Sequence, residues 1–271
     1  MSRYAIRRAV PCMDDARAFA ALEAATLGDS DLTPVEMCSA LALPDHCCYL
    51  ACAGPLCIGL LSTFDTPCAA GQRLELDMLA VDPAWRNQGV ASAMVSRALE
   101  EGRARGISMF RAVVATDNRA SRRVFQRLGL QEQGTRYELL TRVFAGLVPS
   151  PYLPAGWSED WVPDLADSEL DQWRLSGHRG VAVRNASGET VARLAMLPVQ
   201  TMAYTGYWIE QSWAVNAHAA TIALLAGAER AKAASSGEIG ILVPAADSSL
   251  IRGAHQAGYV SIGEYDIFTV D

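Results

Sequence analysis

The sequence has no apolar run long enough to cross a lipid bilayer. The longest helix-like apolar stretch, Ala219 to Ala228, lies between His218 and Glu229 and falls well short of the roughly 20 residues that a transmembrane helix needs. The basic amino-terminal residues lead into Pro11 and two aspartates rather than into an apolar core with a cleavage site. We therefore expect neither a membrane span nor an export signal.

The chain also lacks the cysteine patterns of disulfide scaffolds and zinc sites. Its seven cysteines are an odd number, all lie between Cys12 and Cys68, and none belongs to a C-x-x-C pair. Such a set argues against a disulfide framework and against a tetrahedral zinc site. We expect a cytoplasmic protein that binds no metal.

Neither half of the chain carries an excess of positive charge. Residues 1–150 hold sixteen arginines and sixteen acidic residues, so the whole net charge of −7 lies in residues 151–271. A surface that binds nucleic acid needs a concentrated positive field. We expect no nucleic-acid partner, and the sequence does not indicate the oligomeric state.

Apolar periodicity predicts alternating strands and helices in the first half of the chain. A first helix is expected to start at a cap formed by Asp14 or Asp15, and a later one at Asp117 or Asn118. The predicted strands are residues 4–8, a hairpin within 47–61, and 74–81, 110–115 and 131–144; the predicted helices are 14–27, 33–41, 90–99 and 118–128.

A weaker copy of this order follows a proline-rich segment. Residues 148–156, VPSPYLPAG, contain three prolines and are predicted to be a linker. Val243, Asp247 and Gly258 each lie 129 residues after Val114, Asn118 and Gly129, which indicates an internal duplication. We expect two tandem α/β domains, residues 1–147 and 157–271, each with a mixed, mostly antiparallel sheet flanked by helices.

The loop Arg86 to Ala91 joins a predicted strand to the first turn of a helix. Unpaired backbone N–H groups and the positive end of the helix dipole meet there, so the loop predicts an anion site. Gly89 would let the backbone approach a phosphate closely. The chain has neither a Gly-Lys-Ser/Thr P-loop nor a G-x-G-x-x-G fingerprint, which excludes those two nucleotide sites.

The surroundings of this loop resemble a known enzyme family. Leu79 to Ala91 reads L-x-V-x-P-x-x-R-x-x-G-x-A, and the next predicted helix carries Asn118, Ser121 and Phe125 before Gly129-Leu130. Both motifs are similar to those of the GNAT superfamily of N-acetyltransferases, and their order and spacing agree with that family. The resemblance covers residues 1 to about 147.

The resemblance implies that acetyl-CoA is the co-substrate. Backbone groups of residues 79–81 would pair with the pantetheine amides, N–H groups of residues 87–92 would hold the pyrophosphate, and Asn118 would reach the pantetheine arm. The cofactor-binding residues expected on this basis are Leu79, Ala80, Val81, Arg86, Asn87, Gln88, Gly89, Val90, Ala91, Ser92 and Asn118.

Family members transfer the acetyl group directly, with a base that deprotonates an ammonium acceptor. Glu75 and Asp77 lie two residues apart on a predicted strand and are expected to share a face with Leu79 and Val81, although a β-bulge in this strand would change which residues face inward. We prefer Glu75 as the base, with Asp77 as the close alternative. Both could instead be solvent-facing residues of a half-buried strand.

The chain departs from the family pattern in two places. Phe125 stands where many members have a tyrosine that protonates the leaving sulfur, and Tyr137, water or departure of the bare thiolate are the alternatives. The second half has neither the loop glycine nor the arginine, and Asp247 replaces Asn118. We expect no acetyl-CoA in the second half, which would cover the first and shape the acceptor pocket.

The expected function is therefore N-acetylation of a primary amine, for which a small-molecule acceptor is preferred. The acidic second half favours a cationic acceptor. Two alternatives stay open, namely a protein or peptide amino-terminal acetyltransferase and an acetyl-CoA-binding regulatory or interaction module without turnover.

Overall fold

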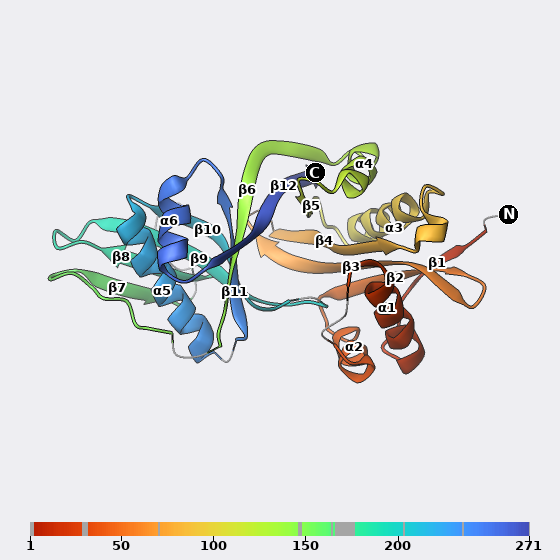
Figure 1. Cartoon of the computed structure of the whole chain (residues 1–271), viewed down its shortest axis with the longest axis horizontal. Coiled ribbons are helices and arrows are strands. Elements are labelled where there is room, and N and C mark those ends of the chain that lie inside the picture. Colours follow the sequence, from red (N-terminus) through yellow and green to blue (C-terminus); the bar gives the residue numbers. More distant parts are fainter. Residues whose placement is uncertain are drawn as a thin grey trace.

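A computed structural model describes residues 3–28, 32–69, 71–145, 148–163, 165, 177–202, 204–234 and 236–270. Figure 1 shows two lobes side by side, the first half of the chain on the right and the second on the left, with β6 and β12 running between them. The predicted boundary residue 147 lies outside the described residues.

The first half follows the order that the sequence predicts. Its elements are β1 (Ala5–Arg8), α1 (Met13–Thr26), α2 (Pro34–Ala40), β2 (His46–Ala53), β3 (Leu56–Cys68), β4 (Gly71–Val81), η1 (Pro83–Trp85), α3 (Val90–Ala104), β5 (Met109–Ala115), α4 (Arg119–Arg127) and β6 (Gln131–Val143).

The second half repeats this order from its first hairpin onward. Two of its strands, β7 and β12, are not predicted from the sequence. Its elements are β7 (Ser158–Val162), β8 (Arg179–Arg184), β9 (Thr190–Gln200), β10 (Thr205–Ala214), α5 (Ala217–Ala233), β11 (Glu238–Pro244), α6 (Ser248–Gln256) and β12 (Val260–Val270).

Side-chain caps set the starts of several helices. Asn118 accepts a hydrogen bond from the Ser121 N–H at 3.1 Å, and Asp247 accepts one from the Leu250 N–H at 3.0 Å. The predicted cap of α1 is wrong, because Cys12 occupies the N-cap position without a side-chain hydrogen bond. Asp15 instead accepts from the Arg7 guanidinium at 2.5 Å, so its carboxylate ties α1 to β1.

Within the described residues, twelve strands form one continuous sheet in the order β1-β2-β3-β4-β5-β12-β6-β11-β10-β9-β8-β7. The β4–β5 and β10–β11 pairs are parallel, and the other described pairs are antiparallel. The two halves have exchanged their last strands: β12 pairs with β5 of the first half, and β6 pairs with β11 of the second. Each half therefore completes the sheet of the other. The domain limits, residues 1–147 and 157–271, stay a prediction.

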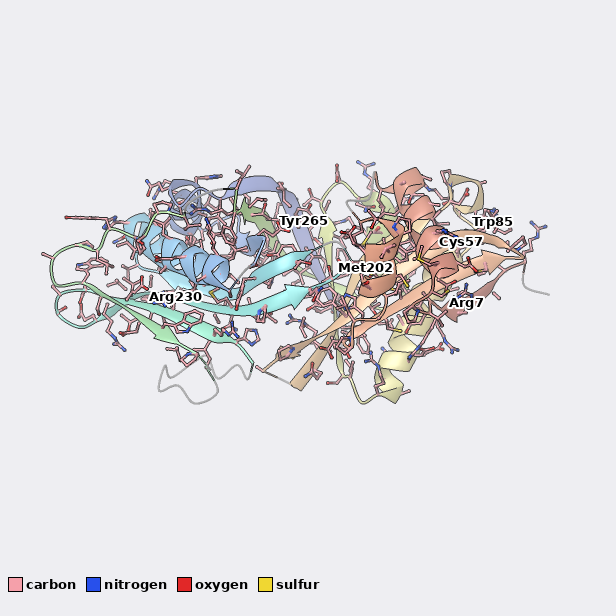
Figure 2. All side chains as sticks on the ribbon, turned by 90° about the horizontal axis from the view of Figure 1, so that it is seen from below. Arg7, Cys57, Trp85, Met202, Arg230 and Tyr265 are labelled. Carbon is pink, nitrogen blue, oxygen red and sulfur yellow. The ribbon has the colours of Figure 1, made fainter. Side chains whose placement is uncertain are left out.

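Within the described residues, three large apolar cores lie against this sheet, beside a small one around Leu165 and Ala195. Residues of α3, with Phe125 of α4, pack on the first half of one face, and α5 and α6 pack on the second half. The opposite face of the first half is covered by α1 and α2, whose core includes Phe19 and Met37. Met202, just beyond β9 in the second half, is 3% exposed and belongs to that same core. Figure 2 shows Met202 where the second half reaches the first.

None of the described helices is long and apolar enough to span a membrane.

The exchange of strands predicts that a break in the linker does not separate the two halves. Tyr152 is 84% exposed, so a specific protease site can be introduced around it. After cleavage, the two pieces should elute together in size-exclusion chromatography without denaturant, because β6 stays between β11 and β12. The uncut protein and protease-treated protein without the site are the controls.

Residues 1–150 expressed alone should aggregate, since β6 loses both neighbours and β5 loses β12, which leaves open strand edges in water. Separation of the cleaved pieces, or a soluble monomeric fragment, would show that each half closes its own sheet.

Candidate functional site

The parallel strands β4 and β5 separate in the middle of β4. Their pairing runs from Arg73–Met109 to Leu76–Ala112 and stops there. β4 continues to Val81 while it still pairs with β3, and β5 continues to Ala115 while it pairs with β12. Beyond Leu76, the described residues therefore place no strand against the β5-facing edge of β4. Its backbone groups are left for another partner.

A β-bulge lies at the same point. Leu76 pairs with Thr63 and Leu79 with Leu61, so Asp77 and Met78 together oppose one residue of β3. The extra residue reverses the alternation of side chains along β4. Leu79 and Val81 pack in the core under α3, as Leu74 and Leu76 do, whereas Met78 and Ala80 pack in the core of α1 and α2. The expectation that Glu75 and Asp77 share a face with Leu79 and Val81 is wrong for this reason.

Glu75 is fully engaged by its neighbours. Its side chain is 7% exposed, and Oε1 accepts from Arg73 Nε at 2.6 Å and from the Thr66 hydroxyl at 2.9 Å. Oε2 accepts from Arg111 Nε at 2.9 Å. Both carboxylate oxygens thus have donors within the protein, and two of these donors are permanently charged.

Asp77 lies one step further along β4, where the strands part. Its side chain is exposed to solvent, and no described residue donates a hydrogen bond to it. Protein packed around the opening nevertheless removes much of the water that would stabilise its charge. This desolvation, with the nearby negative charges of Glu75 and Glu23, raises the pKa of Asp77 to about 7. At neutral pH, Asp77 can therefore accept a proton from a ligand.

The loop after β4 ends in an open helix N-terminus. The Asp82 carboxylate accepts from the Ala84 N–H at 2.8 Å and starts η1. Asn87 and Gly89 then adopt left-handed backbone angles, with φ of 60° and 81°, and Gly89 caps α3 without a side chain. The Ala93 N–H donates to the Gly89 carbonyl at 2.9 Å. The three preceding amides, of residues 90–92, have no intrahelical acceptor.

Two side chains brace this loop from within. Arg86 Nε donates to the Val81 carbonyl at 3.1 Å, and Gln88 Nε2 donates to the Ala84 carbonyl at 3.0 Å. Residues 86–89 are exposed. The capacity of the loop to hold an anion therefore rests mainly on its backbone N–H groups and on the dipole of α3.

Asn118 follows the carboxyl end of β5, beside the end of β4. Its side chain is exposed, and its Oδ1 serves as the cap of α4, which leaves the NH2 group as its hydrogen-bond donor. Phe125, two turns further along α4, is 4% exposed and packs against Phe268 with ring centroids 6.2 Å apart. At this position α4 therefore carries an apolar ring and no hydroxyl that could protonate a leaving sulfur.

The sequence did not indicate Tyr265. It pairs with Ala115 at the end of β5 and with Tyr137 on β6, so two half-buried tyrosines stand side by side next to the separated strands. Arg73 and Arg111 were also missed, although an arginine within the apolar strand segment FRAVV is a visible signal. Glu210 is a comparable signal, because it is a charged residue within the strand segment WIEQSW.

The corresponding helix start in the second half is closed. Asn216 caps α5, and its Oδ1 accepts from the Ala219 N–H at 2.9 Å, whereas Gly89 has no side chain to do so. Trp157 packs edge-on against His218 in the first turn, with centroids 5.8 Å apart. The two halves thus share a fold but differ in how this helix start is capped.

Comparison with protein families identifies the first half. Residues 16–130 match the model described as the acetyltransferase (GNAT) family. The matched residues lie in the first half of the chain, which is therefore similar to the GNAT family. No curated protein matches the sequence. This match supports acetyl transfer from acetyl-CoA as the class of activity.

Solved structures match nearly the whole length of the chain. A GCN5-related N-acetyltransferase from Sphaerobacter thermophilus is 17% identical, with a TM-score of 0.63 over 99% of this chain and 96% of that one. A tandem GNAT protein from the clavulanic acid biosynthesis pathway is 16% identical, with a TM-score of 0.58 over 98% of both chains. A putative acetyltransferase from Pyrococcus horikoshii is 14% identical, with a TM-score of 0.57 over 100% and 90%. The tandem GNAT fold therefore extends over both halves.

The open helix start predicts that a carboxylate at Gly89 prevents acetyl-CoA binding. Gly89→Asp places a negative charge among the amides of residues 90–92, whereas Gly89→Asn is the matched neutral variant, and both residues tolerate the left-handed backbone better than others. Isothermal titration calorimetry should show at least a tenfold weaker affinity for Asp than for Asn, the usual effect of about 1.4 kcal/mol. Equal affinities would remove the loop from the cofactor site.

Proposed function

We propose that the protein is an N-acetyltransferase that moves an acetyl group from acetyl-CoA to a primary amine, with Asp77 as the general base. The observation that carries the proposal is the position of Asp77. It is the solvent-exposed carboxylate where β4 and β5 part, and surroundings that raise its pKa to about 7 suit it to accept a proton at neutral pH.

The path of the co-substrate follows from the order of groups along one strand and helix. The open amides of residues 90–92 and the α3 dipole favour the pyrophosphate. The free edge of β4 from Val81 back to Leu79 can pair with the pantetheine amides, because β5 has left it. A pantetheine arm that runs in this direction brings the thioester toward Asp77. The Asn118 NH2 group, just after the end of β5, can donate a hydrogen bond to this arm.

The chemical step then needs one proton transfer and one substitution. The Asp77 carboxylate takes a proton from the acceptor ammonium, and the freed nitrogen lone pair attacks the thioester carbonyl carbon. The carbon–sulfur bond breaks as the amide forms, and its electron pair leaves on the sulfur as a thiolate. Because thiols have pKa values near 8.5, the thiolate can leave without a strong acid, so the absence of a hydroxyl at Phe125 does not block the reaction.

Glu75 takes a different role in this proposal from the one preferred on sequence grounds. Two arginines and a hydroxyl occupy its oxygens, so a substrate ammonium would have to displace a charged donor to reach it. We assign Glu75 to the support of Arg73 and Arg111 and give the base to Asp77.

The acceptor is proposed to be a cationic small-molecule amine. Asp77 and Glu23 place negative charge near the opening between the strands, which favours an ammonium group before its deprotonation. Release of free thiol from acetyl-CoA should be measured with amino acids, polyamines, aminoglycosides and peptides with free amino termini. Turnover with peptides alone would support amino-terminal acetylation, and binding of acetyl-CoA without any turnover would support a regulatory module.

Substitution of the two carboxylates should separate their roles. Asp77→Asn should lower turnover about 10²-fold with little change in acetyl-CoA affinity, the usual effect of removing a positioned base. Glu75→Gln should instead lower the free energy of unfolding by about 3–5 kcal/mol, because it leaves buried arginines short of a partner. Asp160→Asn, an exposed β7 position paired with Arg184, is the control. Full activity of Asp77→Asn would rule out Asp77 as the base.

The rate should also depend on pH through Asp77. A base acts only when deprotonated, so kcat/KM should rise with pH through about 7 and lose this limb in Asp77→Asn. An acid limb that persists unchanged in the variant would assign the titration to another group.

Acetyl-CoA should bind with a stoichiometry of one per chain. Calorimetry on the full chain tests this, because the Asn216 cap occupies an amide that the first half leaves open. Two equivalent sites would contradict the expected loss of binding in the second half.

A further inference from the structure

Two of the seven cysteines lie directly opposite each other in the sheet. Cys52 of β2 pairs with Cys57 of β3, on either side of the hairpin turn at residues 54–55. Both are free thiols, and both are half-buried. Among the described strand pairs, no other register sets two cysteines face to face. This pair is therefore the strongest candidate for thiol chemistry outside the proposed active site.

A β-bulge turns both side chains toward the same core. The pairing of β2 with β3 shifts between Ala51 and Cys52, which leaves Ile58 as an extra residue of β3. Ile58 packs in the core under α3, whereas Cys57 packs, like Cys52, against the core of α1 and α2. The two thiols thus extend from neighbouring strands to one side of the sheet.

The spacing of the two strands suits a disulfide. Directly opposite Cα atoms of an antiparallel pair lie about 4.5–5.5 Å apart, within the range of about 4.4–6.8 Å that a disulfide spans. The two side chains are also close enough for the charge of Cys52 to act on the thiol of Cys57. A bond between the two sulfur atoms therefore requires no movement of one strand relative to the other.

The two thiols differ in their neighbours. The Arg7 guanidinium donates to the Asp15 carboxylate at 2.6 Å and also to the Cys52 sulfur, and both contacts raise the pKa of Arg7. A guanidinium beside a sulfur favours the thiolate form, which is the reactive one. Burial raises the pKa of the Cys57 thiol to about 11. Cys52 is thus the thiol suited to react first, and Cys57 the one suited to react second.

We propose that Cys52 and Cys57 form a reversible dithiol–disulfide site that small-molecule disulfides oxidise, with Cys52 as the attacking thiol. The Cys52 thiolate attacks one sulfur of the small-molecule disulfide, whose sulfur–sulfur bond breaks and releases one thiolate. Cys57 then gives up its proton and attacks the Cys52 sulfur, which breaks the mixed disulfide and releases the second thiolate. The two cysteine protons end on the two released thiols, and two electrons pass from the cysteine pair to the small molecule.

The site lies next to the loop proposed to hold acetyl-CoA. Directly after Cys57, the Ile58 carbonyl accepts a hydrogen bond from the Asp82 N–H at 3.0 Å. Asp82 begins the segment between β4 and α3. A disulfide would thus fasten the hairpin beside the start of this loop. The thiol chemistry itself does not depend on the proposed acetyl transfer, because it needs neither co-substrate nor acceptor.

Oxidation of the reduced full chain by millimolar glutathione disulfide tests the proposal. After acid quenching, the remaining thiols are alkylated and counted by intact mass spectrometry, and two of the seven should be lost without retained glutathione. Chymotrypsin then separates the two cysteines, because it cleaves after Leu50, Leu56 and Leu60. The peptides of residues 51–56 and 57–60 should remain linked until a reductant is added.

Single serine variants identify the order of the two steps. Cys57→Ser removes the resolving thiol, so the reaction should stop with one glutathione attached to Cys52. Cys52→Ser should lose no pair of thiols, because the buried Cys57 thiol is a poor nucleophile. The matched control is Cys38→Ser, which removes a half-buried α2 thiol beside the same core and should still lose two thiols.

Seven alkylated thiols after this treatment, or linked peptides other than 51–56 and 57–60, overturn the proposal. Loss of two thiols from Cys52→Ser or Cys57→Ser also overturns it, because the disulfide would then belong to other cysteines. Glutathione that stays attached to Cys52 of the unsubstituted chain would show that Cys57 does not resolve the mixed disulfide, and would overturn the pairing. Three of these outcomes use the unsubstituted chain, so the proposal can be overturned even if a serine variant does not fold.

Discussion

β12 lies between β5 and β6, and this placement constrains the rest of the molecule. Because the last strand of each half is enclosed by the other half, the sheet is continuous and neither half can form its own edge there. The exchanged strand also brings Tyr265 to the end of β5, beside the separated strands. The second half is thus a structural part of the site, although the loop that can hold an anion comes from the first half.

The separation of β4 from β5 and the bulge of β4 together define the candidate site. The separation leaves the edge of β4 beyond Leu76 without a described strand partner, and β4 leads through η1 to the open start of α3. The bulge places Leu79 and Val81 on one face of the sheet and leaves Asp77 near the other. The Asp77 side chain is exposed, yet desolvation by the surrounding protein raises its pKa. Burial of a carboxylate without a cation raises its pKa, whereas burial with one lowers it. The environment therefore distinguishes Asp77 from Glu210, whose pKa Arg111 and Arg73 keep below its ordinary value although burial acts in the opposite direction.

Local features of the fold and site could be predicted from the sequence, and long-range ones could not. The Gly89 turn and the Asn118 and Asp247 caps depend on residues within a few positions, so the motifs predict them well. The exchange of β6 and β12 depends on pairing between residues about a hundred or more positions apart. The preference for Glu75 failed to anticipate Arg73 and Arg111, because an ion cluster across two halves leaves no periodic signal.

The comparison of the two halves shows how one fold can leave a helix start open in one copy and cap it with a side chain in the other. Replacing the capping glycine by Asn216 satisfies an amide that an anion would need, so the second loop is stabilised by its own side chain. Pairing Glu210 with two arginines of the first half turns a titratable group into an interface contact. Each change increases local stability at the expense of binding capacity. By contrast, the first half keeps an open helix start and a carboxylate that no described residue pairs with. In the proposed function, the co-substrate and the acceptor would compensate for the stability that these features cost.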